Sequence, residues 1–174
     1  MKGAHRMNLN ALRNMSYGMY IVSSGKDGLG NGQIANTVFQ ITSDPTVIGV
    51  SINKQNLTHE FIEKSKGFSL SILNTDADFK FIGNFGFKSG RDIDKFQNIN
   101  VKHTSLDIPV VLDNTCAWIE CKVINSVDCG THTLFLGELT DCDVLNESEP
   151  MTYSYYHKVV KGKSPKTAPT FINN

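Results

Sequence analysis

The sequence predicts a mainly β protein, an antiparallel barrel that is either closed or split. Segments in which apolar and polar residues alternate recur roughly seven times, which indicates short strands. Turns rich in glycine, asparagine and aspartate separate several of them. Only two short stretches have helical spacing, so the helices are too few to cover an open α/β sheet. This balance of elements favours a barrel.

Length and composition are those of one globular domain covering residues 1–174, large enough to bury a core. Lysine plus arginine (17) balances aspartate plus glutamate (17), so we expect no nucleic-acid partner and no anionic membrane surface. No apolar run approaches the length of a membrane span. The N-terminus lacks the apolar core and cleavage site of a secretory signal, so the expected location is cytoplasmic.

The cysteines indicate neither a metal site nor a disulfide framework. Cys116, Cys121, Cys129 and Cys142 form no Cys-x-x-Cys pair, and no histidine lies at zinc-finger spacing from them. We therefore assign no metal. Cys121 falls on the apolar phase of its strand, which predicts a buried thiol that packs as a small hydrophobe.

The first predicted strand covers residues 16–24. The glycine-rich stretch 25–32 follows as a turn, and a second strand is predicted over residues 33–41. The three glycines of the turn do not form a dinucleotide-binding loop, because their spacing is Gly-x-Gly-x-Gly and a strand follows them instead of a helix.

The clearest alternation in the chain is at residues 47–53, after a break at Pro45. Its apolar residues share one face. On the other face Ser51 and Asn53 lie beside Gly49, whose missing side chain leaves room against the backbone. A face with polar groups and a gap suits the wall of a ligand site.

A short helix is predicted to begin at Thr58. With Thr58 as the N-cap, Leu57 and Ile62 form a hydrophobic staple. Lys54 and Asn56 then lie near a helix N-terminus, whose free N–H groups favour an anion. An ordinary capped surface helix with a solvated lysine explains the same residues, so the residues alone leave both alternatives open.

The other predicted elements are a strand at 67–73, a helix at 76–85, and strands at 109–112, 115–127 and 131–144. Arg91 and Lys95 lie in the segment 87–96, for which a surface loop with ion pairs is the simplest interpretation. His132 falls on the apolar phase of its strand, where a lone histidine is more often structural than catalytic. The tail after residue 150 is expected to pack its tyrosines on a neighbouring surface and then run extended.

Six segments resemble, in the same order, the flavin reductase-like family of FMN-binding split barrels. They are SYGMYIVSS, NGQIANTVFQITSDP, VSINKQNLTHEFI, FGFKSGRDIDKF, GTHTLFLGEL and MTYSYYHKVVKGKSPKTAP. Within this family the chain resembles the flavoprotein domain of high-molecular-weight rubredoxins and stand-alone relatives. The resemblance implies one flavin reductase-like domain over residues 1–174, an antiparallel Greek-key-like barrel with a few short helices. No rubredoxin-type cysteine pairs follow residue 150.

The resemblance implies an FMN site along residues 31–58 and three further positions. The residues that correspond to the isoalloxazine edge and ribityl contacts are Asn36, Thr37, Val38, Gln40, Thr42 and Ser43. Those that correspond to the phosphate cradle are Ser51, Asn53, Lys54, Asn56 and Thr58. Arg91 and Lys95 resemble the basic pair that closes over the polar end of the flavin. His132 matches a histidine near the flavin and the nicotinamide, which gives it the catalytic position.

The implied function is an FMN-dependent oxidoreductase. It would pass electrons from NADH or NADPH through FMN to a flavin, oxygen, ferric iron or a redox protein. One alternative is an electron-transfer flavoprotein with a rubredoxin- or ferredoxin-type partner and no direct NAD(P)H activity. Another is a non-catalytic FMN-binding protein. The resemblance also implies a homodimer in which both chains contribute to each pocket, which would cover the exposed sheet edges.

Overall fold

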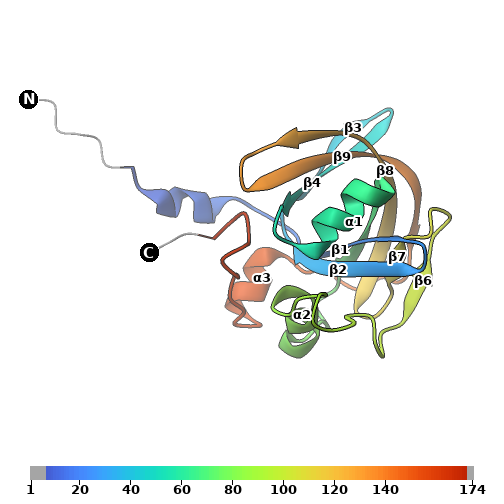
Figure 1. Cartoon of the computed structure of the whole chain (residues 1–174). Helices are drawn as coiled ribbons and strands as arrows, with labels where there is room; N and C mark the ends of the chain where they lie inside the picture. The colour runs from blue at the N-terminus through green and yellow to red at the C-terminus, as the bar shows by residue number, and fades with distance from the viewer. Residues whose placement is uncertain (1–6, 172–174) are drawn as a thin grey trace, which may run out of the picture.

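The computed structural model describes residues 7–171 as a curled antiparallel sheet with short helices around it (Figure 1). The strands are β1 (Tyr20–Lys26), β2 (Leu29–Ala35), β3 (Val38–Ser43), β4 (Thr46–Asn53), β5 (Gly67–Leu73), β6 (Val101–His103), β7 (Pro109–Val111), β8 (Thr115–Asp128) and β9 (His132–Val144). The helices are the 3-10 helix η1 (Leu9–Asn14), α1 (Leu57–Ser65), α2 (Phe79–Gly86) and α3 (Tyr153–Lys158). The mainly β fold class is confirmed.

The order of the strands shows how the sheet closes. Seven strands follow the order β2-β1-β5-β8-β9-β4-β3, so β2 and β3 are the two edges, and β6 pairs with β7 outside this sheet. Only Asn36 and Thr37 separate the two edge strands. Three Cα steps span at most about 11 Å, so the end of one edge lies beside the start of the other. The edges meet there without a shared ladder among the described residues, as in a split barrel.

This seam corrects the prediction of one strand over residues 33–41. Ala35 is the last residue of β2 paired with β1, opposite Tyr20. Val38 is the first residue of β3 paired with β4, opposite Val50. The chain has to leave one ladder and join another between them, so a single strand is wrong.

The β1–β2 hairpin is longer and its turn tighter than predicted. Its ladder runs without a break from the Tyr20–Ala35 pair to the Lys26–Leu29 pair. Only Asp27 and Gly28 form the turn, with φ of 55° and 76°. Asp-Gly suits a two-residue hairpin turn because both residues tolerate positive φ. The predicted turn at 25–32 and the predicted strand start at residue 16 are therefore wrong.

The prediction of Thr58 as an N-cap is also wrong. Asn56 is the N-cap of α1, and Leu57 is its first helical residue. Leu57 and Ile62 therefore do not occupy the positions that the predicted hydrophobic staple requires. The Thr58 hydroxyl instead accepts a hydrogen bond from Asn31 Nδ2 at 2.7 Å, and both side chains are buried. A contact with a strand across the core decides the position of this residue.

Two further helices differ from the predictions. α2 begins at Phe79 and not at residue 76, because Asp78 caps it by accepting from the Phe81 N–H at 2.7 Å. α3 lies in the tail, where no helix is predicted, and the chain after it folds back instead of running extended. Tyr156 is buried, as expected for the tail tyrosines. Of the helices within residues 7–171, none has the length and apolar character that crossing a membrane requires.

Two apolar clusters hold these elements together. One lies inside the barrel, where Val50 and Phe68 of the sheet pack with Ile62 of α1. The other lies outside it, where Phe85 of α2 and Tyr156 of α3 pack against the β1–β2 side. The predicted burial of Cys121 is confirmed in the first cluster, and burial raises the pKa of its thiol to about 12.

Candidate functional site

A cavity of about 360 Å³ lies where β2, β4 and the start of α1 face α2, α3 and the tail. Its volume is within the range of small-molecule sites. Side-chain amides dominate its polar wall, namely Asn31, Gln33, Asn36, Asn53, Gln55 and Asn56. Its apolar wall includes Ile34, Ile82, Phe85 and Phe87. This combination provides a surface for a flat ring together with donors and acceptors for its polar edge.

The charge of the cavity favours an anion. Lys88, Lys95 and Lys163 line it, and none of its lining residues within the described chain is an aspartate or glutamate. The N-terminus of α1 is also in the wall through Asn56 and Leu57. The first N–H groups of a helix carry partial positive charge, so a phosphate is stabilised at this point.

Lys95 is the buried cation of the site. Its side chain is 5% exposed, and Nζ donates to the carbonyls of Gly32 and Phe85, both at 3.0 Å. Burial lowers its pKa to about 8. Two of its three donors tie β2 to α2, so Lys95 is not the surface residue that its sequence context suggests.

Gln33 provides the test of whether a flavin fits. Gln33 lines the cavity, and its Oε1 is buried with no hydrogen-bond partner among the described residues. A buried acceptor without a donor is costly, so a ligand in the adjoining cavity that brings an N–H within reach of this oxygen is favoured. The flavin ring carries an N–H between two carbonyls, and amide side chains match both. The residues present therefore fit a flavin.

Sequence reasoning missed Gln33. The only available signal was its place in the polar stretch 31–58, because a glutamine in a half-buried strand usually faces solvent. Gln33 becomes distinctive only once β2 is placed against α2 and the tail.

The C-terminal segment, residues 163–170, forms one side of the cavity, and we call it the strap. Figure 1 shows the red end of the chain returning past α3. Asn36 Nδ2 donates to Thr170 Oγ1 at 2.8 Å, and Asn53 Nδ2 donates to the Thr167 carbonyl at 3.3 Å. Two of the predicted flavin residues thus hold the strap.

His132, the predicted catalytic residue, also contacts the strap. Its Nε2 lies 3.2 Å from the Thr167 carbonyl, and its Nδ1 lies 2.9 Å from Thr131 Oγ1. A carbonyl only accepts, so Nε2 carries the hydrogen and, in the neutral ring, Nδ1 accepts from the threonine. His132 therefore reaches the cavity through the strap and is not itself a lining residue.

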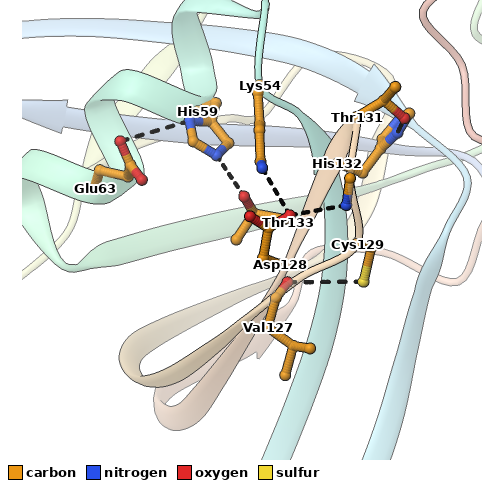
Figure 2. Close-up of polar contacts among 10 residues, drawn as sticks. Lys54, His59, Glu63, Val127, Asp128, Cys129, Thr131, His132 and Thr133 are labelled. Atoms are coloured by element: carbon orange, nitrogen blue, oxygen red, sulfur yellow. Dashed lines mark hydrogen bonds and ion pairs between the residues drawn. The ribbon is translucent and has the colours of Figure 1, made fainter.

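Lys54 and Arg91 form ion pairs elsewhere. Lys54 Nζ is 2.7 Å from Asp128 Oδ1 at the end of β8 (Figure 2), and Arg91 pairs with Glu60 of α1. The hydrogen bond from Lys54 lowers the pKa of Asp128, and the one from Arg91 lowers the pKa of Glu60. All four groups are well exposed, so these pairs contribute little to stability.

A buried histidine lies next to the Lys54 pair, in a second and more open hollow. Figure 2 shows His59 between Glu63 and Thr133, with Nε2 2.8 Å from Thr133 Oγ1 and Nδ1 3.7 Å from Glu63 Oε2. Burial lowers the pKa of His59. Lys54 lines this hollow and does not line the cavity at the N-terminus of α1.

The structure thus brings together part of the predicted set. The predicted residues that line the cavity are Asn36, Ser51, Asn53, Asn56 and Lys95. Those that lie outside its wall are Thr37, Val38, Gln40, Thr42, Ser43, Lys54, Thr58, Arg91 and His132. The β3 residues among them are largely exposed on the sheet edge, and their flavin contacts stay a prediction.

Comparison with known proteins decides the family. The model of the flavin reductase like domain matches residues 12–163. The chain belongs to the flavin reductase-like family. The predicted resemblance is confirmed, and with it the class of the protein, a flavin-dependent oxidoreductase.

Two curated relatives are similar over most of their length. The chain is 53% identical over 165 residues to the high molecular weight rubredoxin of Moorella thermoacetica, and the match covers 95% of this chain and 72% of that protein. It is 43% identical over 168 residues to the ferric-chelate reductase (NAD(P)H) of Archaeoglobus fulgidus, covering 97% and 99%.

Solved structures show the same fold. The FMN-binding protein of Thermus thermophilus superposes with a TM-score of 0.75 at 21% identity, covering 88% of this chain and 90% of that one. The flavin reductase PheA2 superposes with a TM-score of 0.69 at 29% identity, covering 82% and 88%. The split-barrel prediction is therefore confirmed.

Proposed function

We propose that the protein is an FMN-dependent oxidoreductase that takes electrons from NADH or NADPH and passes them to an acceptor. The cavity supports this proposal, because among the described residues its wall is rich in amides, contains three lysines and no acid, and includes Gln33, whose Oε1 has no partner. The relative named ferric-chelate reductase (NAD(P)H) supports the choice of donor. The resemblance of the sequence to FMN-binding split barrels supports the choice of FMN as the flavin.

The residues of the cavity have separate roles in this proposal. FMN supplies the redox chemistry when bound, and the protein provides binding, orientation and charge. Ile34 and Phe87 present an apolar surface to the ring, and Gln33 accepts from its N–H edge. Lys163 and the N–H groups at the start of α1 hold the phosphate. Lys95 places a positive charge at the wall, which stabilises an anionic reduced cofactor.

The proposal extends to a homodimer through the β3 edge. Phe39 and Ile41 of β3 are 47% and 43% exposed on a strand that has a neighbour on one side only in the described chain. An exposed apolar edge strand is normally covered, and a second copy can cover it. Gln40 and Thr42 would then lie at the boundary between the copies. Sedimentation of wild type and Phe39→Asp tests this, because a monomeric wild type would contradict it.

A second candidate is an electron-transfer flavoprotein that exchanges electrons with a rubredoxin-type protein. The 53% identity to a protein named high molecular weight rubredoxin favours it. In this case the protein would accept no electrons directly from a nicotinamide.

Anaerobic reduction separates the candidates. The FMN-loaded protein is mixed with NADH or NADPH, and the loss of flavin absorbance is followed. We expect reduction by at least one nucleotide. Reduction by reduced rubredoxin alone would support electron transfer between proteins, and a protein that takes up no FMN would contradict both candidates.

A further inference from the structure

The strap is fastened to the barrel by side chains that line the cavity. Asn36 holds it at Thr170, and Asn53 holds it at the Thr167 carbonyl. Tyr153 of α3 contacts Thr170 Oγ1 at 3.1 Å. The Thr170 hydroxyl therefore joins the barrel and α3 at the far end of the strap.

The base of the strap is fixed by close packing. The Tyr156 hydroxyl donates to the Lys163 carbonyl at 3.1 Å, and Gly162 lies against the Tyr156 ring. A Cβ at Gly162 would come 1.9 Å from Tyr156 Cζ, so only glycine allows this approach. The strap thus begins at a rigid base, Gly162, and a few hydrogen bonds hold its other end.

The cavity persists with the strap in place. Strap residues Lys163, Ser164 and Thr167 line it together with Gln33 and Phe85 from the barrel and α2. A ligand in this space therefore has the strap on one side and the sheet on the other. Its departure on that side requires the hydrogen bonds of Asn36 and Asn53 to break.

We infer that the strap retains the flavin. It closes over the cavity and makes FMN a bound prosthetic group instead of a substrate that exchanges at every turnover. This inference rests on the proposed function and refines it, because a retained flavin passes its electrons to a different molecule.

FMN release measures retention directly. Wild type and a chain that ends at Lys163, which keeps the proposed phosphate contact and removes the fastened part of the strap, are loaded with FMN, and release after dilution is followed by the rise in flavin fluorescence. We expect release to be roughly tenfold to hundredfold faster without the strap, from the loss of its hydrogen bonds. Equal rates would overturn the inference. Slower release from the shortened chain would overturn it too, because the strap would then compete with FMN.

A point variant keeps the strap and removes its fastening. Thr170→Val loses the hydroxyl that contacts Asn36 and Tyr153 at nearly unchanged volume, so FMN release is expected to be severalfold faster. Thr170→Ser retains a hydroxyl and should restore the slow rate. If Thr170→Ser releases FMN as fast as Thr170→Val, the hydroxyl is not the fastening and the inference is overturned.

Proteolysis gives a readout that does not depend on activity. Trypsin cleaves after Lys163 and Lys166, and closure on FMN should slow both cuts in wild type but much less in Thr170→Val. Cleavage that is insensitive to FMN in wild type would contradict closure. A full chain that binds no FMN would overturn the proposed function as well, whereas tight binding with unchanged release rates in the variants would overturn only the strap.

Discussion

Lys95→Met is expected to remove a pH dependence of stability that wild type shows between pH 7 and pH 10. Burial lowers the pKa of Lys95 to about 8 in the folded protein, whereas in the unfolded chain the lysine has its ordinary pKa of 10.5. Between these values the unfolded chain binds more protons than the folded one, so the free energy of unfolding rises with pH. Above pH 10.5 Lys95 is neutral in both states and its burial costs no stability through charge. As the pH falls from 10.5 to 8 the folded protein loses stability relative to the unfolded chain, and below 8 the loss is complete.

The size of the effect follows from the two pKa values. Linkage gives a gain of roughly 2.5 kcal/mol for wild type between pH 7 and pH 10 from this one group. The variant lacks that gain, so the difference in unfolding free energy between wild type and Lys95→Met should widen by this amount. At every pH the variant also leaves the carbonyls of Gly32 and Phe85 without their donor.

Urea unfolding at pH 7, 8, 9 and 10 measures the difference. Lys88→Met is the matched control, because Lys88 lines the same cavity but is exposed. The unfolding free energy of Lys88→Met should differ from that of wild type by the same amount at all four pH values. If the Lys95→Met difference is also constant over this range, Lys95 is not the buried titrating group described above.

Three other substitutions test the site. Thr58→Val should lower the unfolding free energy by about 1–3 kcal/mol in urea unfolding, because the buried Asn31 amide loses its acceptor; an unchanged midpoint would contradict this role. His132→Ala should slow flavin reduction more than it weakens FMN binding in stopped-flow and titration experiments, and an unchanged reduction rate would leave His132 structural. Lys54→Ala should change stability by less than about 1 kcal/mol, because its pair with Asp128 is exposed. A large loss of FMN affinity in Lys54→Ala would instead support the phosphate contact that the resemblance implies.

Local patterns predicted the strands well. The alternation at 47–53 lies within β4 (Thr46–Asn53), and the strand at 67–73 matches β5 (Gly67–Leu73). In both, one face meets the barrel core, so the sequence period follows burial directly. The overall fold class followed from the number and spacing of such segments.

Contacts between distant residues escaped prediction. The seam at Asn36 depends on β2 and β3 joining different ladders, which no local pattern reveals. Thr58 accepts a hydrogen bond from Asn31, which lies 27 residues earlier in the chain. The strap reaches Asn36 from a position 134 residues later. Lys95 is buried only because two carbonyls from β2 and α2 accept its hydrogens.

The most direct test of the central claim, that this cavity is the flavin site, is the FMN affinity of Gln33→Ala beside that of Gln97→Ala. Gln33 lines the cavity and its buried Oε1 lacks a partner among the described residues, whereas Gln97 is exposed outside the cavity. Fluorescence titration should give an affinity roughly tenfold weaker for Gln33→Ala and no change for Gln97→Ala. Wild-type affinity in both variants would contradict the placement of the flavin in this cavity.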